Sequence, residues 1–341
     1  LPEKFAVLGT AGSSLTEEDF RVSMTEAIRA ADKKAGEKTI NEFISRLSYF
    51  SMDFKNSSSY NELSVKINNL GHACGKSRNY IFYLATLPAL FPDISVNLGK
   101  AGLNKNDGGY SRIIVEKPFG YDLNSAIELN RIMHENFDES QIYRIDHYLG
   151  KETVQNIMVT RFSNGIFEPI WNRNYIHHIE VTSAENMGIE NRGGYYESSG
   201  ALRDMVQSHL LRLVALIAME PPSSFDPDAV RNEQLKVLQS LRRLKPEEIE
   251  KSVIRGQYTA SKINGKEIKG YREEKNVAPD SRTETFAAIK FYIDNWRWGG
   301  VPFYIRTGKH MPTRVTEAVI HFRKTPHYLF KESKDMSDNQ L

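Results

Sequence analysis

Hydrophobic and polar positions follow two different patterns along the chain. Over the first 145 or so residues, short and nearly continuous apolar runs alternate with longer stretches of mixed polarity. Such runs are typical of parallel strands that helices cover on both faces. A helix is expected after Thr16, a suitable N-cap followed by an acidic first turn. The strands predicted in this part are residues 5–8, 80–85, 112–117 and 141–145.

From about residue 175 the pattern changes to half-exposed strands separated by loops. In the last of them Ala318, Ile320 and Phe322 fall on one face, as alternation predicts. The strands are predicted at residues 175–182, 285–293, 302–307 and 315–323, and the helices at 202–219 and 228–244. Strands joined by loops indicate an antiparallel sheet. The sequence therefore predicts an α/β domain over residues 1–145 and an α+β domain over residues 146–341.

Composition limits the protein class further. A chain of 341 residues with net charge +2 suffices for about two domains and gives no reason to expect nucleic acid or a membrane surface as partner. Its longest apolar run, residues 210–219, is interrupted by Arg212 and is shorter than the ~20 residues that a bilayer requires. The single cysteine, Cys74, fits a reducing compartment and is expected to be an inert thiol. No signal peptide is visible, so a cytoplasmic protein is expected.

The densest group of reactive side chains lies at residues 144–152. Asp146 and His147 are neighbours whose side chains diverge, which favours two separate roles. On one helical turn, His147 and Lys151 would share a face and suit a phosphate dianion, although Gly150 weakens the helical assumption. The alternative is a solvated turn.

Lys117 ends the predicted strand 112–117 and precedes Pro118, which disfavours the helical region for it and allows a cis bond. Because ligands bind at the carboxyl ends of parallel strands, Lys117 and Asp146 are candidates for one site. A strand-terminal lysine in water is the alternative for Lys117.

His209 lies on an apolar helical stripe, where a histidine is usually a satisfied core residue. A partner carboxylate would make it a candidate base. Asp204 is nearby, but in an α-helix five residues separate two side chains by ~140°, so the sequence itself supplies no partner.

No metal site is predicted. His177 and His178 are adjacent, and successive strand residues point to opposite faces, so they cannot chelate one ion. Residues 9–14 follow a strand and contain two glycines, but they lack the third glycine and the later acid of a dinucleotide-binding loop, and a plain turn is at least as good an interpretation.

Several motifs resemble those of glucose-6-phosphate dehydrogenases. The most specific is Asp-His-Tyr-Leu-Gly-Lys-Glu at residues 146–152. The others lie at residues 116–120, 155–156, 169–173, 192–196, 204–209, 299–303 and 306–309, so the match covers nearly the whole chain. The resemblance implies a Rossmann-like coenzyme domain over residues 1–145, followed by a substrate-binding and oligomerisation domain over 146–341 with a large, mostly antiparallel sheet.

The resemblance also implies the chemistry and the residues that perform it. Glucose 6-phosphate would be oxidised at C1, with His209 as general base and Asp146 as its partner. His147, Tyr148 and Lys151 would bind the 6-phosphate, and Lys117 would contact both sugar and coenzyme. The remaining residues implied to position the sugar or its phosphate are Glu185, Asp204, Lys309 and Arg314.

Two departures from the family bear on the coenzyme and the assembly. The family's first strand and its glycine-rich coenzyme loop would precede Leu1, and the C-terminal end is also missing, so we expect a fragment of a protein that forms a homodimer or homotetramer. By register, residues 9–14 then follow the second strand, with Gly12 and Ser13 near the coenzyme. Members that use NADP usually carry an arginine where this chain has Gly12. We expect NADP as coenzyme with NAD as a second option, in a relaxed or NAD-leaning preference.

Two alternatives remain open. The glucose–fructose oxidoreductase-like family also has a Glu-Lys-Pro after a Rossmann strand, but it lacks the Asp-His-Tyr-Leu-Gly-Lys run. From another class, the chain would be a non-catalytic remnant that binds sugar phosphate.

Overall fold

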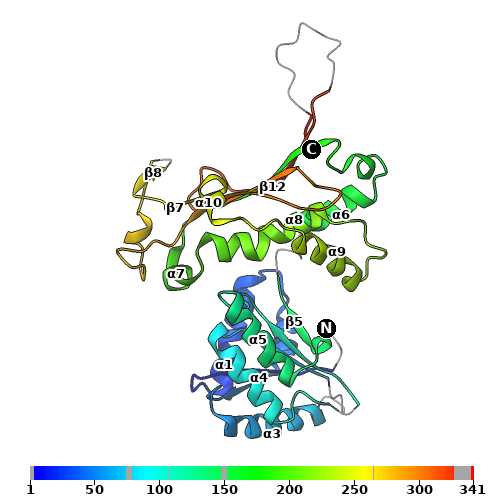
Figure 1. Cartoon of the computed structure of the whole chain (residues 1–341). Helices are drawn as coiled ribbons and strands as arrows, with labels where there is room; N and C mark the ends of the chain where they lie inside the picture. The colour runs from blue at the N-terminus through cyan, green and yellow to red at the C-terminus, as the bar shows by residue number, and fades with distance from the viewer. Residues whose placement is uncertain (1–3, 74–78, 107, 147–151, 264, 326–338) are drawn as a thin grey trace. The chain divides into compact units, whose positions relative to one another are not determined.

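A computed structural model of the chain describes residues 4–73, 79–106, 108–146, 152–263, 265–325 and 339–341 (Figure 1). The chain divides into two compact units, Leu1–Ile145 and Asp146–Leu341. Each unit has its own hydrophobic core, formed in the first by residues between Met52 and Ile142 and in the second by residues between Val154 and Ile320. Cys74 lies outside the described residues.

The first unit contains parallel strands, as the continuous apolar runs predict. β1 pairs in parallel with β2, and β3, β4 and β5 form a second parallel group in that order. The strands are β1 (Val7–Ala11), β2 (Leu47–Ser51), β3 (Tyr80–Leu84), β4 (Ser111–Val115) and β5 (Ile142–Arg144). Residues 9–14 were interpreted as a loop or turn, which is wrong for the first three, because β1 stays paired with β2 up to Ala11.

Helices connect these strands. The predicted N-cap is confirmed: the Thr16 hydroxyl accepts a hydrogen bond of 3.1 Å from the Asp19 amide, and Asp19 bonds back to Thr16. The helices are α1 (Glu17–Ala31), α2 (Glu37–Ile44), α3 (Ser57–Ala73), α4 (Phe91–Lys100) and α5 (Leu123–Asn136), with the short 3-10 helices η1 (Pro88–Leu90) and η2 (Glu139–Gln141).

The second unit is built on a five-stranded sheet in the order β12-β6-β11-β10-β7. Three of its neighbouring pairs are antiparallel and one, β6 with β11, is parallel, so the prediction of a mostly antiparallel sheet is confirmed. These strands are β6 (Ile176–Ala184), β7 (Val253–Gly256), β10 (Phe286–Tyr292), β11 (Pro302–Gly308) and β12 (Val315–Phe322), and β8 (Ser261–Ile263) pairs separately with β9 (Lys266–Ile268). Ile320 is buried and Ala318 and Phe322 pack against the core, as predicted.

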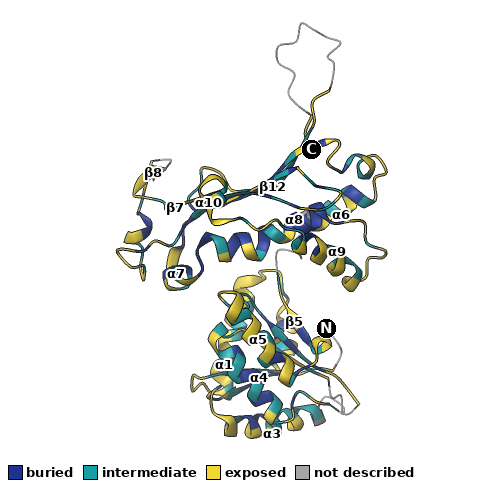
Figure 2. Cartoon of the chain, in the orientation of Figure 1, coloured by how far each residue is buried: buried dark blue, intermediate teal, exposed yellow. Residues whose placement is uncertain are grey.

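The predicted helix at 202–219 begins as a π-helix, η5 (Leu202–Leu210), which packs on β6 and β11 and continues as α8 (Leu211–Ala218). Every residue of α8 from Leu213 to Ala218 is buried, whereas η5 combines buried residues with exposed ones (Figure 2). The other helices are α6 (Glu152–Phe162), α7 (Gly193–Ala201), α9 (Pro227–Gln239), α10 (Pro246–Ser252) and the 3-10 helices η3 (Glu168–Ile170), η4 (Glu190–Arg192) and η6 (Tyr271–Glu273). The helix predicted to reach residue 244 ends at Gln239, because Leu241 pairs with Ile293 instead.

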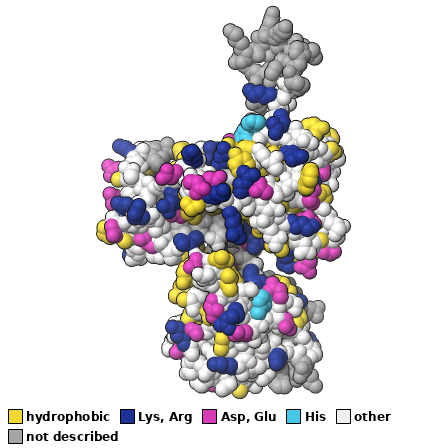
Figure 3. Space-filling model, in the orientation of Figure 1, with side chains coloured by type: hydrophobic (Ala, Val, Ile, Leu, Met, Phe, Trp, Pro, Cys, Tyr) yellow, Lys and Arg dark blue, Asp and Glu magenta, His cyan; other side chains and the backbone are white. Residues whose placement is uncertain are grey.

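The surface carries both signs of charge. On the face shown in Figure 3, Lys and Arg side chains lie among Asp and Glu side chains. Within the described ranges, none of the helices combines the length and the apolar character needed to cross a membrane.

Candidate active site

A backbone break precedes the helix that carries His209. Gly200, at the end of α7, has φ 61° and ψ 179°, a conformation that only glycine adopts readily. The Glu284 carboxylate lies against it and accepts a hydrogen bond of 3.0 Å from the Leu202 amide at the start of η5. This buried carboxylate therefore caps the π-helix and fixes where it begins.

The π-helical turn changes which side chains share a face. The Leu211 amide bonds to the carbonyl of Val206, five residues earlier, so residues five apart lie nearer to one face than they would in an α-helix. The expected divergence of ~140° between Asp204 and His209 assumed an α-helix, and the angle is smaller in a π-helix. The structure nevertheless pairs His209 with Asp146, while Asp204 bonds to Tyr195. Asp204 and His209 are both buried, and π-helical turns are frequent at functional sites.

His209 has the carboxylate partner that its sequence surroundings did not supply. Its Nδ1 lies 3.0 Å from Oδ1 of Asp146, and its side chain is 1% exposed. The Nε of Arg212, one turn along the helix, lies 3.9 Å from Oδ2 of the same carboxylate. An imidazole bonded through Nδ1 to a carboxylate has a fixed tautomer, which leaves Nε2 to act as a base.

Glu185 and Lys309 meet because β6 and β11 are the parallel pair of this sheet. Both strands end at the same edge, where Ala184 is the register partner of Gly308. The Glu185 amide donates to the Gly308 carbonyl, and the Lys309 ammonium forms a short ion pair with the Glu185 carboxylate. The Lys309 side chain is 3% exposed, so its charge is almost removed from water.

Tyr195 and Tyr196 link this pair to η5. Tyr195 donates a hydrogen bond of 3.1 Å to Asp204, and burial together with the Asp204 charge raises the pKa of Tyr195 to about 12. The Lys309 ammonium lies 5.8 Å from the centre of the Tyr196 ring. Burial raises the pKa of Tyr196 far above its usual range, and the charges of Asp204, Glu284 and Glu185 add to the effect.

A pocket of about 440 Å³ opens beside the ends of β1 and β2 in the first unit. Ser13, next to Gly12, bonds to Tyr49 through both its hydroxyl and its carbonyl. The residues that line the pocket carry hydroxyl, carboxylate and ammonium groups. It is lined by Gly12, Ser51, Met52, Asp53, Phe54, Lys55, Ser59 and Leu90.

The remaining candidates are less constrained. Lys117 follows the end of β4, is partly exposed, and forms a cis peptide bond with Pro118. Arg314 is exposed, directly before β12. His147, Tyr148 and Lys151 lie outside the described residues.

Sequence reasoning gave no role to several residues of these candidate sites, among them Glu284, Lys55 and Tyr196. Glu284 had no local signal, since its partner is 82 residues away. Lys55 had none either, because β2 was not predicted. Tyr196 belongs to a family-like motif at residues 192–196, but no role had been given to it.

Comparison with known proteins assigns both units to one family. The family model described as "Glucose-6-phosphate dehydrogenase, NAD binding domain" matches residues 1–156, and that described as "Glucose-6-phosphate dehydrogenase, C-terminal domain" matches residues 158–341. A solved structure titled "Glucose-6-phosphate dehydrogenase in complex with its substrate glucose-6-phosphate" superposes with a TM-score of 0.87 at 36% identity, covering 98% of this chain and 67% of that one.

Curated relatives agree with this assignment. The glucose-6-phosphate 1-dehydrogenase of Aggregatibacter actinomycetemcomitans is 49% identical over 100% of this chain and 68% of its own length. That of Bacillus subtilis is 47% identical, over 99% of this chain and 68% of its own. The chain spans about two thirds of the length of these relatives. It therefore belongs to the glucose-6-phosphate dehydrogenase family and not to the glucose–fructose oxidoreductase-like alternative.

Proposed function

We propose that His209 is the general base with which this glucose-6-phosphate dehydrogenase oxidises the C1 hydroxyl of glucose 6-phosphate. The observation that carries the proposal is the bond between His209 Nδ1 and Asp146, because it directs the lone pair of Nε2 away from the carboxylate. His209 is buried on a capped helix, so its ring has little freedom to rotate. A base that is oriented before the substrate binds needs little rearrangement during the reaction.

The reaction then balances as a proton and a hydride. His209 takes the proton of the C1 hydroxyl, the C1–O bond becomes a carbonyl, and the C1 hydrogen leaves with its electron pair, giving a lactone. Bound NADP⁺ or NAD⁺ supplies the hydride acceptor. The imidazolium that forms is stabilised by the Asp146 carboxylate.

We assign sugar positioning to the ends of β6 and β11 and to η5. Glu185, Asp204 and Lys309 offer charged groups that are buried or half-buried and already fixed by protein contacts. Arg314 is assigned there through the family resemblance. The same resemblance supports phosphate binding by the three residues outside the described ranges: His147, Tyr148 and Lys151.

Coenzyme binding is assigned to the first unit. The pocket beside Gly12 suits the ribose end of the coenzyme, because its lining offers the hydroxyls of Ser51 and Ser59 and the ammonium of Lys55, next to the Asp53 carboxylate. Ser13 is assigned there through the family resemblance. Lys117, at the end of β4, is proposed to contact coenzyme and sugar. From the family resemblance we also propose that the full-length protein is cytoplasmic. We further propose that it forms a homodimer or homotetramer, and light scattering would test this oligomeric state.

The test is His209→Ala in the full-length protein, with His134→Ala, an exposed histidine of α5, as the matched control. We expect kcat to fall at least ~10²-fold with little change in KM, as for removal of a general base, while the control keeps its activity. A His209→Ala enzyme with more than about a third of wild-type kcat would contradict this role. Wild-type protein that binds glucose 6-phosphate without oxidising it would support the non-catalytic alternative.

A further inference from the structure

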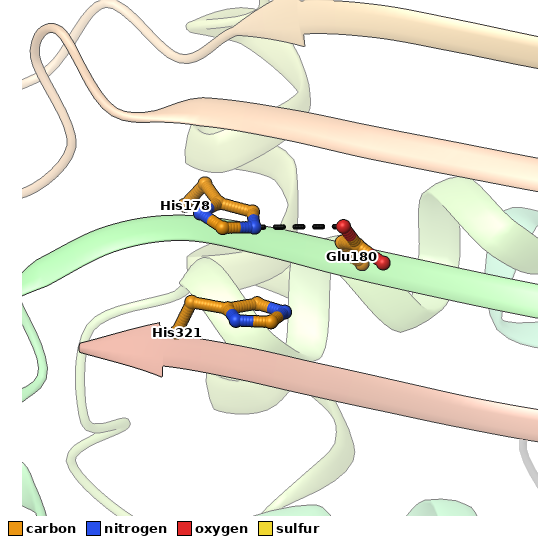
Figure 4. Close-up of side chains that lie close together, drawn as sticks. All are labelled: His178, Glu180 and His321. Atoms are coloured by element: carbon orange, nitrogen blue, oxygen red, sulfur yellow. Dashed lines mark ion pairs between the residues drawn. The ribbon is translucent and has the colours of Figure 1, made fainter. Parts of the chain in front are cut away.

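Three side chains with metal-binding atoms lie together on one face of the sheet of the second unit (Figure 4). His178 of β6 is the cross-strand partner of His321 of β12, and Glu180 follows two residues after His178 on the same face. Their candidate ligand atoms all lie within 4.8 Å of one another. We call these three residues the β6–β12 site.

The three side chains are near enough to reach one ion after their rings turn. The two imidazole rings are stacked with centroids 3.9 Å apart, and Nε2 of His178 lies 3.5 Å from Oε1 of Glu180. Zinc ligands sit about 2.0–2.2 Å from the ion in a tetrahedral arrangement, so two of them are about 3.3–3.6 Å apart. Because the stacked rings are nearly parallel, at least one imidazole has to turn before both face the same ion, and side chains that are only partly buried can make this rotation.

A fourth residue orients the first ligand. A β-bulge where His321 and Phe322 pair with β6 displaces His177, so that its Nδ1 lies 2.8 Å from Nδ1 of His178. The expectation that these adjacent histidines point to opposite faces is wrong for this reason. When Nδ1 of His178 donates to His177, Nε2 carries the lone pair, which is the usual arrangement around a metal-bound imidazole.

Arg306 is a cation near the β6–β12 site. It lies 3.7 Å from Oε2 of Glu180, the carboxylate oxygen that does not face His178, and its Nε donates to Thr182. The oxygen that faces His178 remains directed at the site.

We propose that His178, Glu180 and His321 form a binding site for a divalent transition-metal ion, with zinc as the best match. Two imidazoles and one carboxylate suit zinc, whereas magnesium and calcium prefer oxygen ligands throughout. Three protein ligands leave a fourth position for water. The site uses none of the residues assigned to glucose 6-phosphate or to the coenzyme.

Calorimetric titration of the tag-free, chelator-treated full-length protein with zinc chloride tests the site. We compare the wild type with His178→Asn, His321→Asn and Glu180→Gln. His134→Asn is the matched control, because His134 is an exposed histidine of α5 that lies near Glu139, at 2.6 Å, and Asn130, at 3.2 Å. We expect one zinc ion per chain in the wild type and in the control, at least tenfold weaker binding in each ligand variant, and no binding of magnesium.

Unchanged kcat without zinc shows that each variant is folded. Equal zinc affinity in the wild type and in the His178→Asn and His321→Asn variants would overturn the proposal, as would a wild type that binds no zinc. A loss that also appears in His134→Asn would mean that zinc binds elsewhere.

Discussion

The candidate sites of the two units differ in the exposure of their charged side chains, which are mainly buried in the second unit and mainly exposed in the first. In the second unit Asp204, His209 and Lys309 are at most 5% exposed and are bonded to other side chains. In the first unit the pocket beside Gly12 is lined by Asp53 and Lys55, both exposed. Buried charges must be paired before any ligand arrives, whereas exposed ones are screened by water and act mainly on the ligand. Substitutions in the second unit should therefore change kcat strongly, and those in the pocket should change coenzyme affinity modestly.

The largest effect expected from this difference is that of Asp146→Asn. An asparagine amide can donate to Nδ1 of His209, which leaves the proton on Nε2 and removes the base. We expect kcat to fall about 10²-fold or more, with KM for both substrates nearly unchanged. Asp228→Asn on α9, an exposed carboxylate that pairs with Arg231, is the control. If the Asp146→Asn enzyme kept a near-normal kcat, the bond between Asp146 and His209 would not be needed for the reaction. The expected difference between the two units would then be wrong.

Gly200→Ala tests whether the backbone, as well as the side chains, prepares the second site. An added Cβ would lie 2.5 Å from the Glu284 carboxylate, at a position with φ 61°. Strain at such a position costs roughly 1–3 kcal/mol, and the start of the helix that bears His209 has to shift. We expect a lower Tm and a reduced kcat. Gly194→Ala is the control in the same helix α7, because its added Cβ would meet nothing within 4 Å. Equal Tm and kcat in the Gly200→Ala and Gly194→Ala variants would show that the unusual backbone at Gly200 does not position η5.

Local patterns in the sequence predicted much of the fold, and long-range pairing decided the rest. Continuous apolar runs identified β3 and β4, and alternation identified β12, because each pattern depends only on burial of neighbouring positions. β2 was missed, because Ser48 interrupts its apolar run although Leu47, Ser48 and Tyr49 are all buried, and because its partner β1 lies 40 residues earlier. The site shows the same division. The family-like motifs named His209 and Asp146, but their contact spans 63 residues. The ion pair of Glu185 with Lys309 spans 124 and follows from the parallel register of two distant strands.

Lys55→Ala tests the modest effect expected in the exposed pocket. An arginine is absent at Gly12, and Lys55 is the cation among the residues that line the pocket. One charge-assisted bond to a 2′-phosphate is worth about 1.5 kcal/mol, so KM for NADP⁺ should rise about tenfold while that for NAD⁺ stays constant. Lys38→Ala, an exposed lysine of α2, is the control. Equal changes for both coenzymes would exclude 2′-phosphate recognition, and preference for NADP⁺ would then need another cation.

Glu197→Gln is expected to have the smallest effect. It tests whether a hydrogen-bonded carboxylate of the second unit, away from the candidate site, contributes to stability. Burial raises the pKa of Glu197, but hydrogen bonds of 2.6 Å from Ser281 and Tyr271 outweigh it, so the pKa lies below the usual 4.5. A lowered pKa in the folded state adds stability above pH 4.5 that is lost as the pH falls through the folded value. Glu197→Gln should thus lower the Tm at neutral pH, and the difference from the wild type should shrink on acidification. Glu250→Gln, on the exposed side of α10, should show no such trend. A Tm difference that stays constant with pH would mean that shape, and not charge, is what Glu197 contributes.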